Sequence, residues 1–325
     1  MKPLRVFVAS SVVIAFVQSP VIAQVVTPSP NLGADVASQV ISSSQGGNVL
    51  DGAARKVTGL AAGELNQAAK SWLDQYFPYA EFGVGLGSPT KPTFGALVVA
   101  PLSNREDVVN TIFNQTSIYH NDGRTTLNLG LGYRRLASEN KILLGVNAFY
   151  DQEFPHNHQR SSIGFEARSN VAEVNANRYI SMSNWKDVGA GYEERALGGH
   201  DIELGLALPY TPWAKLYGRK FQWNAYDGAS NIEGSDYTLR AAIPLLPGLV
   251  IEAGRRDFVS GKDVEFARIT FQITGPDRNR EPKPLFTEQA YHLTSMEDRR
   301  YEKVRRENLI IKQRRSQFKV SFVGT

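Results

Sequence analysis

Four side chains between residues 151 and 158 are of the types that bind metal ions. Asp151 and Glu153 supply carboxylates, and His156 and His158 are two positions apart, so on a strand both rings would point the same way. A proline and an asparagine fall between them, and these residues are typical of a turn. The segment therefore favours a turn between two strands over a metal site.

Three other motifs are also weaker than they first look. Gly199-His200-Asp201 has the histidine and acid found in outer-membrane proteases, but no second carboxylate pair or serine motif accompanies it. The run from Gly83 to Gly87 alternates like a strand, and no helix follows as a phosphate loop requires. The basic run 299–306 could bind anionic lipid or lipopolysaccharide, although charges exposed to solvent or lying in the lumen of a β-barrel are the simpler interpretation. We therefore expect no enzymatic activity, cofactor or metal.

The elements that carry these residues repeat one pattern, about ten residues of alternating polarity closed by a turn. In TTLNLGLGYR (125–134), the leucines and Tyr133 share one face, while Asn128, Gly130, Gly132 and Arg134 share the other. An even number of such strands can close without an exposed edge. We predict twelve: 79–87, 94–103, 110–119, 125–136, 141–153, 160–169, 172–183, 200–208, 213–224, 235–245, 249–258 and 263–273.

This pattern favours an all-β fold, a twelve-stranded antiparallel transmembrane β-barrel, over a soluble β-sandwich. The strands are longer than is usual in soluble sheets, and charge and glycine crowd the predicted inner faces. Aromatic residues fall near strand ends, as in interfacial girdles: Tyr119, Tyr133, Tyr150, Tyr179, Tyr210 and Trp213. The predicted lumen-facing polar residues are Asn128, Arg134, Asn147, Asp151, Glu166, Asp201, Glu203 and Glu252.

The N-terminal residues indicate export. Lys2 and Arg5 precede an apolar run too short to span a bilayer, and Val21-Ile22-Ala23 resembles a cleavage site, so 1–23 reads as a signal peptide. Residues 24–77 contain helix-compatible stretches and predict a short periplasmic helical segment or a flexible spacer. The absence of cysteine excludes disulfides, zinc–thiolate sites and thiol nucleophiles. We assign 78–274 to the barrel and 275–325 to a basic tail.

The tail holds the chain's excess of positive charge. Residues 276–325 contain twelve Lys/Arg against seven Asp/Glu, whereas the whole chain carries +4. Export argues against nucleic acid as a partner. A twelve-stranded barrel is wide enough to hold an extended segment, and we predict that the tail lies in the barrel lumen against inward acids, namely Glu166, Asp201, Glu203 and Glu252. The candidate lumenal linker residues are Arg278, Arg280, Lys283, Arg299, Arg300, Arg305 and Arg306.

Several motifs, in order over roughly 70–275, resemble the translocator domain of the intimin/invasin family, the inverse autotransporters of type V secretion. They are Phe113-Asn114-Gln115, the strand 127–134, Gly145–Asp151 with Arg160 and Ile163–Ala167, Asn177-Arg178-Tyr179 with Trp185, Glu194-Arg195-Ala196, Gly199-His200-Asp201, and Pro209 with Pro212. Residues 291–311 are similar to the family's post-barrel segment, in Arg299-Arg300-Tyr301, Val304, Arg306, Asn308 and Ile310.

The resemblance implies a barrel inserted in the Gram-negative outer membrane by the barrel assembly machinery, with periplasmic chaperones as partners. It also implies that both ends of the barrel segment are periplasmic and that a linker threads out through the pore. The family's adhesin passengers would begin where this chain ends, so adhesion to a host or neighbouring cell and a role in virulence rest on analogy. The leading prediction is a non-enzymatic barrel that anchors and exports its own C-terminal segment, in contact with outer-membrane lipids and lipopolysaccharide. The alternatives are a passenger-less porin-like or structural envelope barrel and, third, an outer-membrane hydrolase.

Overall fold

The computed structural model describes residues 73, 75–88, 91–277 and 284–317. The predicted signal peptide and nearly all of the predicted periplasmic helical segment lie outside these residues. Residues 73, 75 and 76 are helical. No helix in the described part of the chain is long and apolar enough to cross a membrane.

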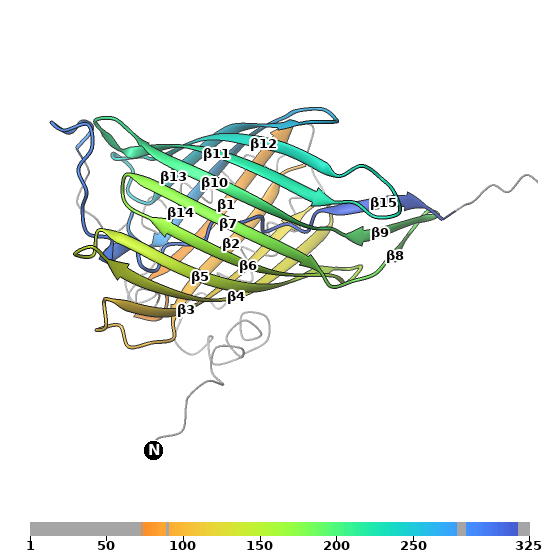
Figure 1. Cartoon of the computed structure of the whole chain (residues 1–325), viewed down its shortest axis with the longest axis horizontal. Coiled ribbons are helices and arrows are strands. Elements are labelled where there is room, and N and C mark those ends of the chain that lie inside the picture. Colours follow the sequence, from red (N-terminus) through yellow and green to blue (C-terminus); the bar gives the residue numbers. More distant parts are fainter. Residues whose placement is uncertain (1–72, 74, 89–90, 278–283, 318–325) are drawn as a thin grey trace, which may run out of the picture. The chain divides into compact units, whose positions relative to one another are not determined.

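The chain from Tyr79 to Thr274 forms a closed antiparallel barrel of twelve strands (Figure 1). Around the barrel the order is β1-β14-β13-β12-β11-β10-β7-β6-β5-β4-β3-β2, so β1 and β14 meet to close the sheet. The barrel strands are β1 (Tyr79–Ser88), β2 (Thr93–Pro101), β3 (Asn110–Asn121), β4 (Arg124–Ala137), β5 (Ile142–Phe154), β6 (His158–Arg168), β7 (Ala172–Ser181), β10 (Gly198–Leu208), β11 (Thr211–Asn224), β12 (Ile232–Ala242), β13 (Leu249–Phe258) and β14 (Val264–Thr274).

All twelve predicted strands are present, with ends that differ by a few residues. The run Gly83–Gly87 lies within β1, as its alternation predicted. Three further strands were not predicted: β8 (Lys186–Gly189), β9 (Tyr192–Ala196) and β15 (Lys312–Ser316) form a separate sheet in the order β15-β9-β8. β8 and β9 are a hairpin in the connection from β7 to β10, and β15 belongs to the tail.

The two faces of the wall differ in polarity as the period-two pattern predicted. On β4, Leu131 is 58% exposed on the outer face, whereas Asn128 and Arg134 are buried on the inner face. On β10, Leu204 is exposed and Asp201 and Glu203 are buried. Because polar groups are costly to bury without partners, this inversion relative to a soluble protein is stable only when apolar lipid surrounds the outside.

The aromatic girdle was predicted correctly at some positions and wrongly at others. Tyr133 and Tyr210 are exposed on the outside. Tyr179, in contrast, is fully buried in the interior, where its hydroxyl donates to Asp201 Oδ2 at 2.8 Å. Tyr119 also has an interior partner, Asn308, whose side-chain amide donates to its hydroxyl. The alternation of the strand, and not closeness to a strand end, decides which way these rings point.

Small residues on the inner face make room for rings from neighbouring strands. A Cβ at Gly132 would lie 2.2 Å from the Phe113 ring, and a Cβ at Gly130 would lie 2.2 Å from the Phe149 ring. Each ring therefore occupies the space that a side chain at the paired glycine of strand β4 would fill. This pairing keeps bulky rings inside a barrel that must also hold a further segment of chain.

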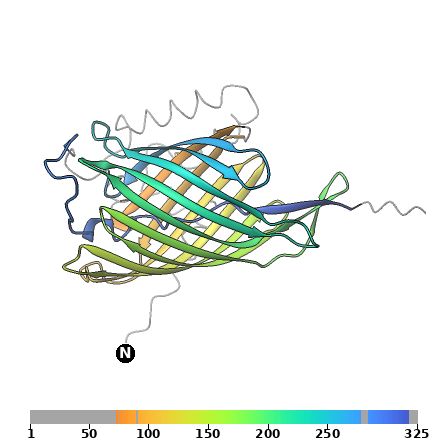
Figure 2. The ribbon, with the colours of Figure 1, turned by 45° about the horizontal axis from the view of Figure 1, so that its top comes forward.

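That further segment is the tail, which runs lengthwise through the barrel (Figure 2). We call the end where β1 begins and β14 finishes the near end, and the opposite end, which carries the β8–β9 hairpin, the far end. Residues 284–296 hydrogen-bond to near-end turns, and a short 3₁₀ helix, η1 (Glu297–Arg299), precedes the interior stretch 300–311. The tail then leaves at the far end as β15, which pairs with β9.

A charge on the outer wall tests the lipid-facing assignment. We expect Leu204→Arg to destabilise the barrel by about 2–4 kcal/mol, the cost of an arginine near the bilayer midplane. The free energy of unfolding is measured by urea titration in lipid vesicles, with heat-modifiable gel migration reporting the folded fraction. Leu204→Ile is the matched control and is expected to be nearly neutral. If the arginine variant unfolds like the isoleucine variant, Leu204 does not face lipid.

Candidate functional site

The candidate site is the interface between the barrel interior and the tail. At the near end the tail follows the rim over three successive turns. Thr287 and Ala290 exchange backbone hydrogen bonds with Tyr210, at 2.9 and 3.1 Å. The Asn170 amide donates to the His292 carbonyl at 2.7 Å. Next, the Met296 N–H donates to the Asn140 carbonyl at 2.7 Å. These bonds fix where the tail turns into the barrel.

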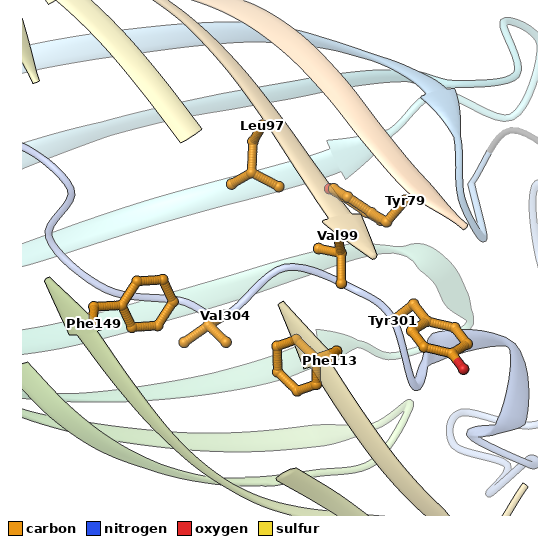
Figure 3. Packing of buried hydrophobic residues seen from close by; sticks show 7 residues of the cluster. All are labelled: Tyr79, Leu97, Val99, Phe113, Phe149, Tyr301 and Val304. Carbon is orange, nitrogen blue, oxygen red and sulfur yellow. The ribbon is translucent and has the colours of Figure 1, made fainter. Parts of the chain in front are cut away.

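Just inside, an apolar collar surrounds two tail side chains (Figure 3). Tyr301 and Val304 pack against five wall residues, which are Tyr79, Leu97, Val99, Phe113 and Phe149. On β3, two residues beyond Phe113 of the collar, Gln115 Oε1 accepts a hydrogen bond from the Val304 N–H at 2.8 Å. The collar gives the tail an apolar contact, and a second apolar cluster that includes Tyr179 and Trp223 packs against Ile311 further along the tail.

Acidic residues of the tail pair with arginines of the wall. Glu302 lies 2.8 Å from Arg168 and accepts from Arg299 of the tail itself at 3.0 Å. Further along, Glu307 lies 3.2 Å from Arg219 and 3.4 Å from Arg256. The tail is therefore not held only by its basic residues against wall acids. Tail acids paired with wall arginines also contribute.

Basic residues of the tail reach wall acids on several strands. Lys303 lies 2.6 Å from Glu81 of β1. Arg305 bridges Glu203 of β10 and Glu252 of β13, at 2.5 and 3.1 Å. One guanidinium thus joins two strands on the same side of the barrel.

Asp151 is the centre of the most deeply buried group of charges. Arg306 of the tail approaches it with both terminal nitrogens, at 2.9 and 2.7 Å, and Arg160 of β6 donates from Nε at 2.9 Å. The side chains of Asp151, Arg160 and Arg306 are all inaccessible to solvent. Asn128 of β4 donates to the same carboxylate at 2.7 Å. Two guanidinium groups and one carboxylate are thus paired with one another away from solvent.

At the far end the tail becomes a strand. Lys312–Ser316 pairs antiparallel with Ala196–Tyr192, and Lys312 also lies 2.5 Å from Glu153. Arg314 and Arg315 pair with Glu194 and Glu193, each at 2.9 Å. Burial alone would raise the pKa of the Glu194 carboxyl, but the cations around it hold that pKa below its usual value. This sheet fastens the tail as it leaves the barrel.

The predicted lumen-facing residues differ in whether they touch the tail. Asp151, Glu203 and Glu252 contact tail arginines, and Asn128 and Arg134 donate to tail carbonyls. Glu166 and Asp201, which we expected against the tail, instead pair with wall residues: Glu166 with Arg134, and Asp201 with Asn177 and Tyr179. Asn147 is buried on the inner face.

The predicted lumenal linker residues lie in different places. Arg299, Arg305 and Arg306 lie inside the barrel, whereas the Arg300 side chain donates to the Arg105 carbonyl at the near-end rim. Arg278, Arg280 and Lys283 lie outside the described residues. Arg134 was the one wall arginine predicted, whereas Arg160, Arg168, Arg219 and Arg256 of the wall and the tail acids Glu302 and Glu307 were missed.

The residues that could have formed a metal site are paired with cations, and the histidine and acid of the protease-like motif lie on opposite faces of the wall. Asp151 holds arginines, and Glu153 lies between Arg124 and Lys312. Within the described residues no cluster of histidine and acid has the composition of a metal site. His200 lies on the outer face of β10 and Asp201 on the inner face, so the wall separates this pair.

Comparison with known proteins agrees with this architecture. The family model of the inverse autotransporter beta-domain matches residues 33–308. Intimin of Citrobacter freundii is 32% identical over 198 residues, which is 60% of this chain and 20% of intimin. The inverse autotransporter adhesin YeeJ of Escherichia coli (strain K12) is 29% identical over 216 residues, or 62% of this chain and 9% of YeeJ. A further relative from the same strain is 31% identical, and the match covers 57% of its length. The chain thus spans only part of the curated relatives it matches.

A solved chain from a study of in-meso crystallisation of membrane proteins has the same fold. Its TM-score is 0.60 at 23% sequence identity, and the match covers 73% of this chain and 100% of that one. The family match extends over most of the sequence, including the interior stretch of the tail up to residue 308. The chain therefore belongs to the inverse autotransporter beta-domain family and is an outer-membrane β-barrel.

Proposed function

We propose that this barrel anchors the chain in the outer membrane and exports its own C-terminal segment to the cell surface. The observation that carries the proposal is the path of the tail. Residues 300–311 lie inside the barrel, and β15 lies at the end opposite to that where β14 finishes. In this proposal the near end is periplasmic, the far end is extracellular, residues 1–23 are a signal peptide and residues 24–77 remain in the periplasm.

Relatives with intimin, invasin and adhesin in their names support an attachment role for whatever the far end presents. Host or neighbouring-cell surfaces are the proposed targets. The barrel assembly machinery and periplasmic chaperones are the proposed insertion partners. The role requires no catalytic group, because binding and threading involve no bond making. The tail inside the barrel also weighs against a porin-like function, which needs an open interior.

The orientation can be tested with single cysteines, since the chain has none of its own. We expect Gln317→Cys, at the far end, to react with a membrane-impermeant maleimide on intact cells. Glu288→Cys, an exposed position at the near end, is the matched control and should react only after the outer membrane is permeabilised. The reverse pattern, or equal protection of both positions, would contradict export.

A further inference from the structure

The barrel interior binds the tail's backbone as well as its side chains. Seven carbonyls between residues 300 and 309 accept hydrogen bonds from wall side chains. Arg134 donates to the carbonyls of Arg300 and Glu302, Arg168 to that of Lys303, Asn177 to that of Arg305, Arg160 to those of Glu307 and Leu309, and Asn128 to that of Asn308. Backbone N–H groups of Val304 and Glu307 donate to Gln115 and Tyr179.

These backbone partners come from one side of the barrel. They lie on β3, β4, β6 and β7, which with β5 form a continuous arc of the wall. The opposite side, β1 and β10–β13, contacts tail side chains through ion pairs, for example Glu81 with Lys303 and Glu203 with Arg305. We call the first set of strands the backbone-binding arc. Some ion pairs, such as Asp151 with Arg306, also come from this arc.

Each main donor of the arc is held in place by a carboxylate of the wall. Glu166 binds Arg134 at 2.6 Å, and Asp201 accepts from Asn177 at 2.8 Å. Asp151 does the same for Arg160 and Asn128. The donors are therefore oriented toward the tail without depending on it, and the wall acids offset the arginine charge.

The wall acids that pair with tail cations also keep partners of their own. Glu252 lies 2.9 Å from Arg268, and Glu153 lies 3.0 Å from Arg124. Glu203 accepts from Asn175 at 3.3 Å. When the tail shifts, these carboxylates remain paired, so the usual penalty for uncovering a buried charge is reduced.

Further polar groups on the arc are available to a chain in another register. Among the described residues, the Gln115 side-chain N–H groups, the Asn147 amide and the Ser162 hydroxyl are buried without a hydrogen-bond partner. They lie on β3, β5 and β6. Carbonyls recur along any extended polypeptide, whatever its side chains.

We propose that the backbone-binding arc is a binding site for extended polypeptide backbone of any sequence, with residues 300–309 as its resting occupant. A different segment in transit would find the same donors. The inference deepens the export function and rests on it for its purpose, but the binding itself can be measured without export.

Single-channel recording of the purified full chain in planar lipid bilayers tests the site through the dwell time of the tail-blocked state. In the wall variant Asn128→Leu/Asn177→Leu, two neutral backbone donors are lost and the tail keeps its charges. We expect its blocked dwell time to fall at least tenfold. Thr238→Val, a buried polar change on β12 outside the arc, is the matched control and should alter the dwell time less than threefold.

A second variant carries residues 303–309 in reverse order, which preserves composition and charge, leaves Arg306 in place against Asp151 and destroys the register of the other ion pairs in this stretch. We expect its blocked dwell time to stay within about threefold of native. A dwell time as short as that of the wall variant would overturn the proposal, since the ion pairs of Lys303, Arg305 and Glu307 would then carry the binding. If the double wall variant fails to show heat-modifiable migration, Asn177→Leu alone should still shorten the block several-fold. A long block with no surface labelling of Gln317→Cys would contradict export while leaving this inference intact.

Discussion

Replacing Asp151 with asparagine is expected to release the tail from the barrel. The variant leaves Arg160 and Arg306 buried together without the carboxylate they share. Removing one partner of a buried charged group costs about 3–5 kcal/mol. Arg306 can avoid that cost by moving into water with the tail, whereas Arg160 is fixed on β6. We therefore expect the native barrel to conduct poorly and Asp151→Asn to open for most of the recording.

The same recordings provide the control and the decisive comparison. Glu139→Gln removes an exposed acid that pairs with Lys141 on a near-end turn and should change nothing measurable. Adding Arg306→Gln to Asp151→Asn removes the stranded tail cation, so blocking should partly return. If the two substitutions prove additive, the carboxylate and the tail arginine act independently and the buried group is not what retains the tail.

The barrel could be predicted because it depends on a local signal. The alternation on β4 and β10 alone decides that Leu131 and Leu204 face out while Asn128 and Asp201 face in. An even number of such strands then lets an antiparallel sheet close without an exposed edge. The direction in which each side chain points needs no long-range information.

The pairing inside the barrel could not be predicted, because it depends on strand register and on the path of the tail. Sequence showed that Glu166 and Asp201 point inward, but not that Arg134, two strands away, and Asn177, on the adjacent strand, lie within reach of them. Glu203, equally inward, has fewer wall donors and is left to Arg305. The wall donors within reach of an inward carboxylate, and not its negative charge alone, decide whether it contacts the tail.

The far-end sheet was also missed, although its sequence contains a usable signal. Consecutive acids, Glu193 and Glu194, lie in the connection between β7 and β10, and consecutive arginines, Arg314 and Arg315, lie in the tail. Neither segment has the apolar alternation that reveals a membrane strand, since both lie beyond the barrel. Complementary charge in two short extended segments is the pattern that could have linked them.

Side chains added at two glycines of β4 should disrupt the barrel interior. A Cβ at Gly130 or Gly132 would lie 2.2 Å from the ring of Phe149 or Phe113. Overpacking of this kind typically costs about 1–3 kcal/mol per site. We expect Gly130→Val/Gly132→Val to lose most heat-modifiable barrel, measured by gel migration after refolding into lipid. Gly218→Ala is the matched control, because nothing lies within 4 Å of its added methyl group.

The displaced Phe113 and Phe149 rings should also disturb the packing of the tail. Phe113 and Phe149 belong to the collar around Val304 and Tyr301, and Arg306 lies over the Phe149 ring at 4.3 Å. Rings pushed off β4 can move only toward the tail, so barrel closure and tail binding should fail together. Phe113→Ala added to Gly132→Val restores that space and should recover a folded barrel. If it recovers none, the glycine is needed for the strand's backbone itself and not for the ring that rests on it.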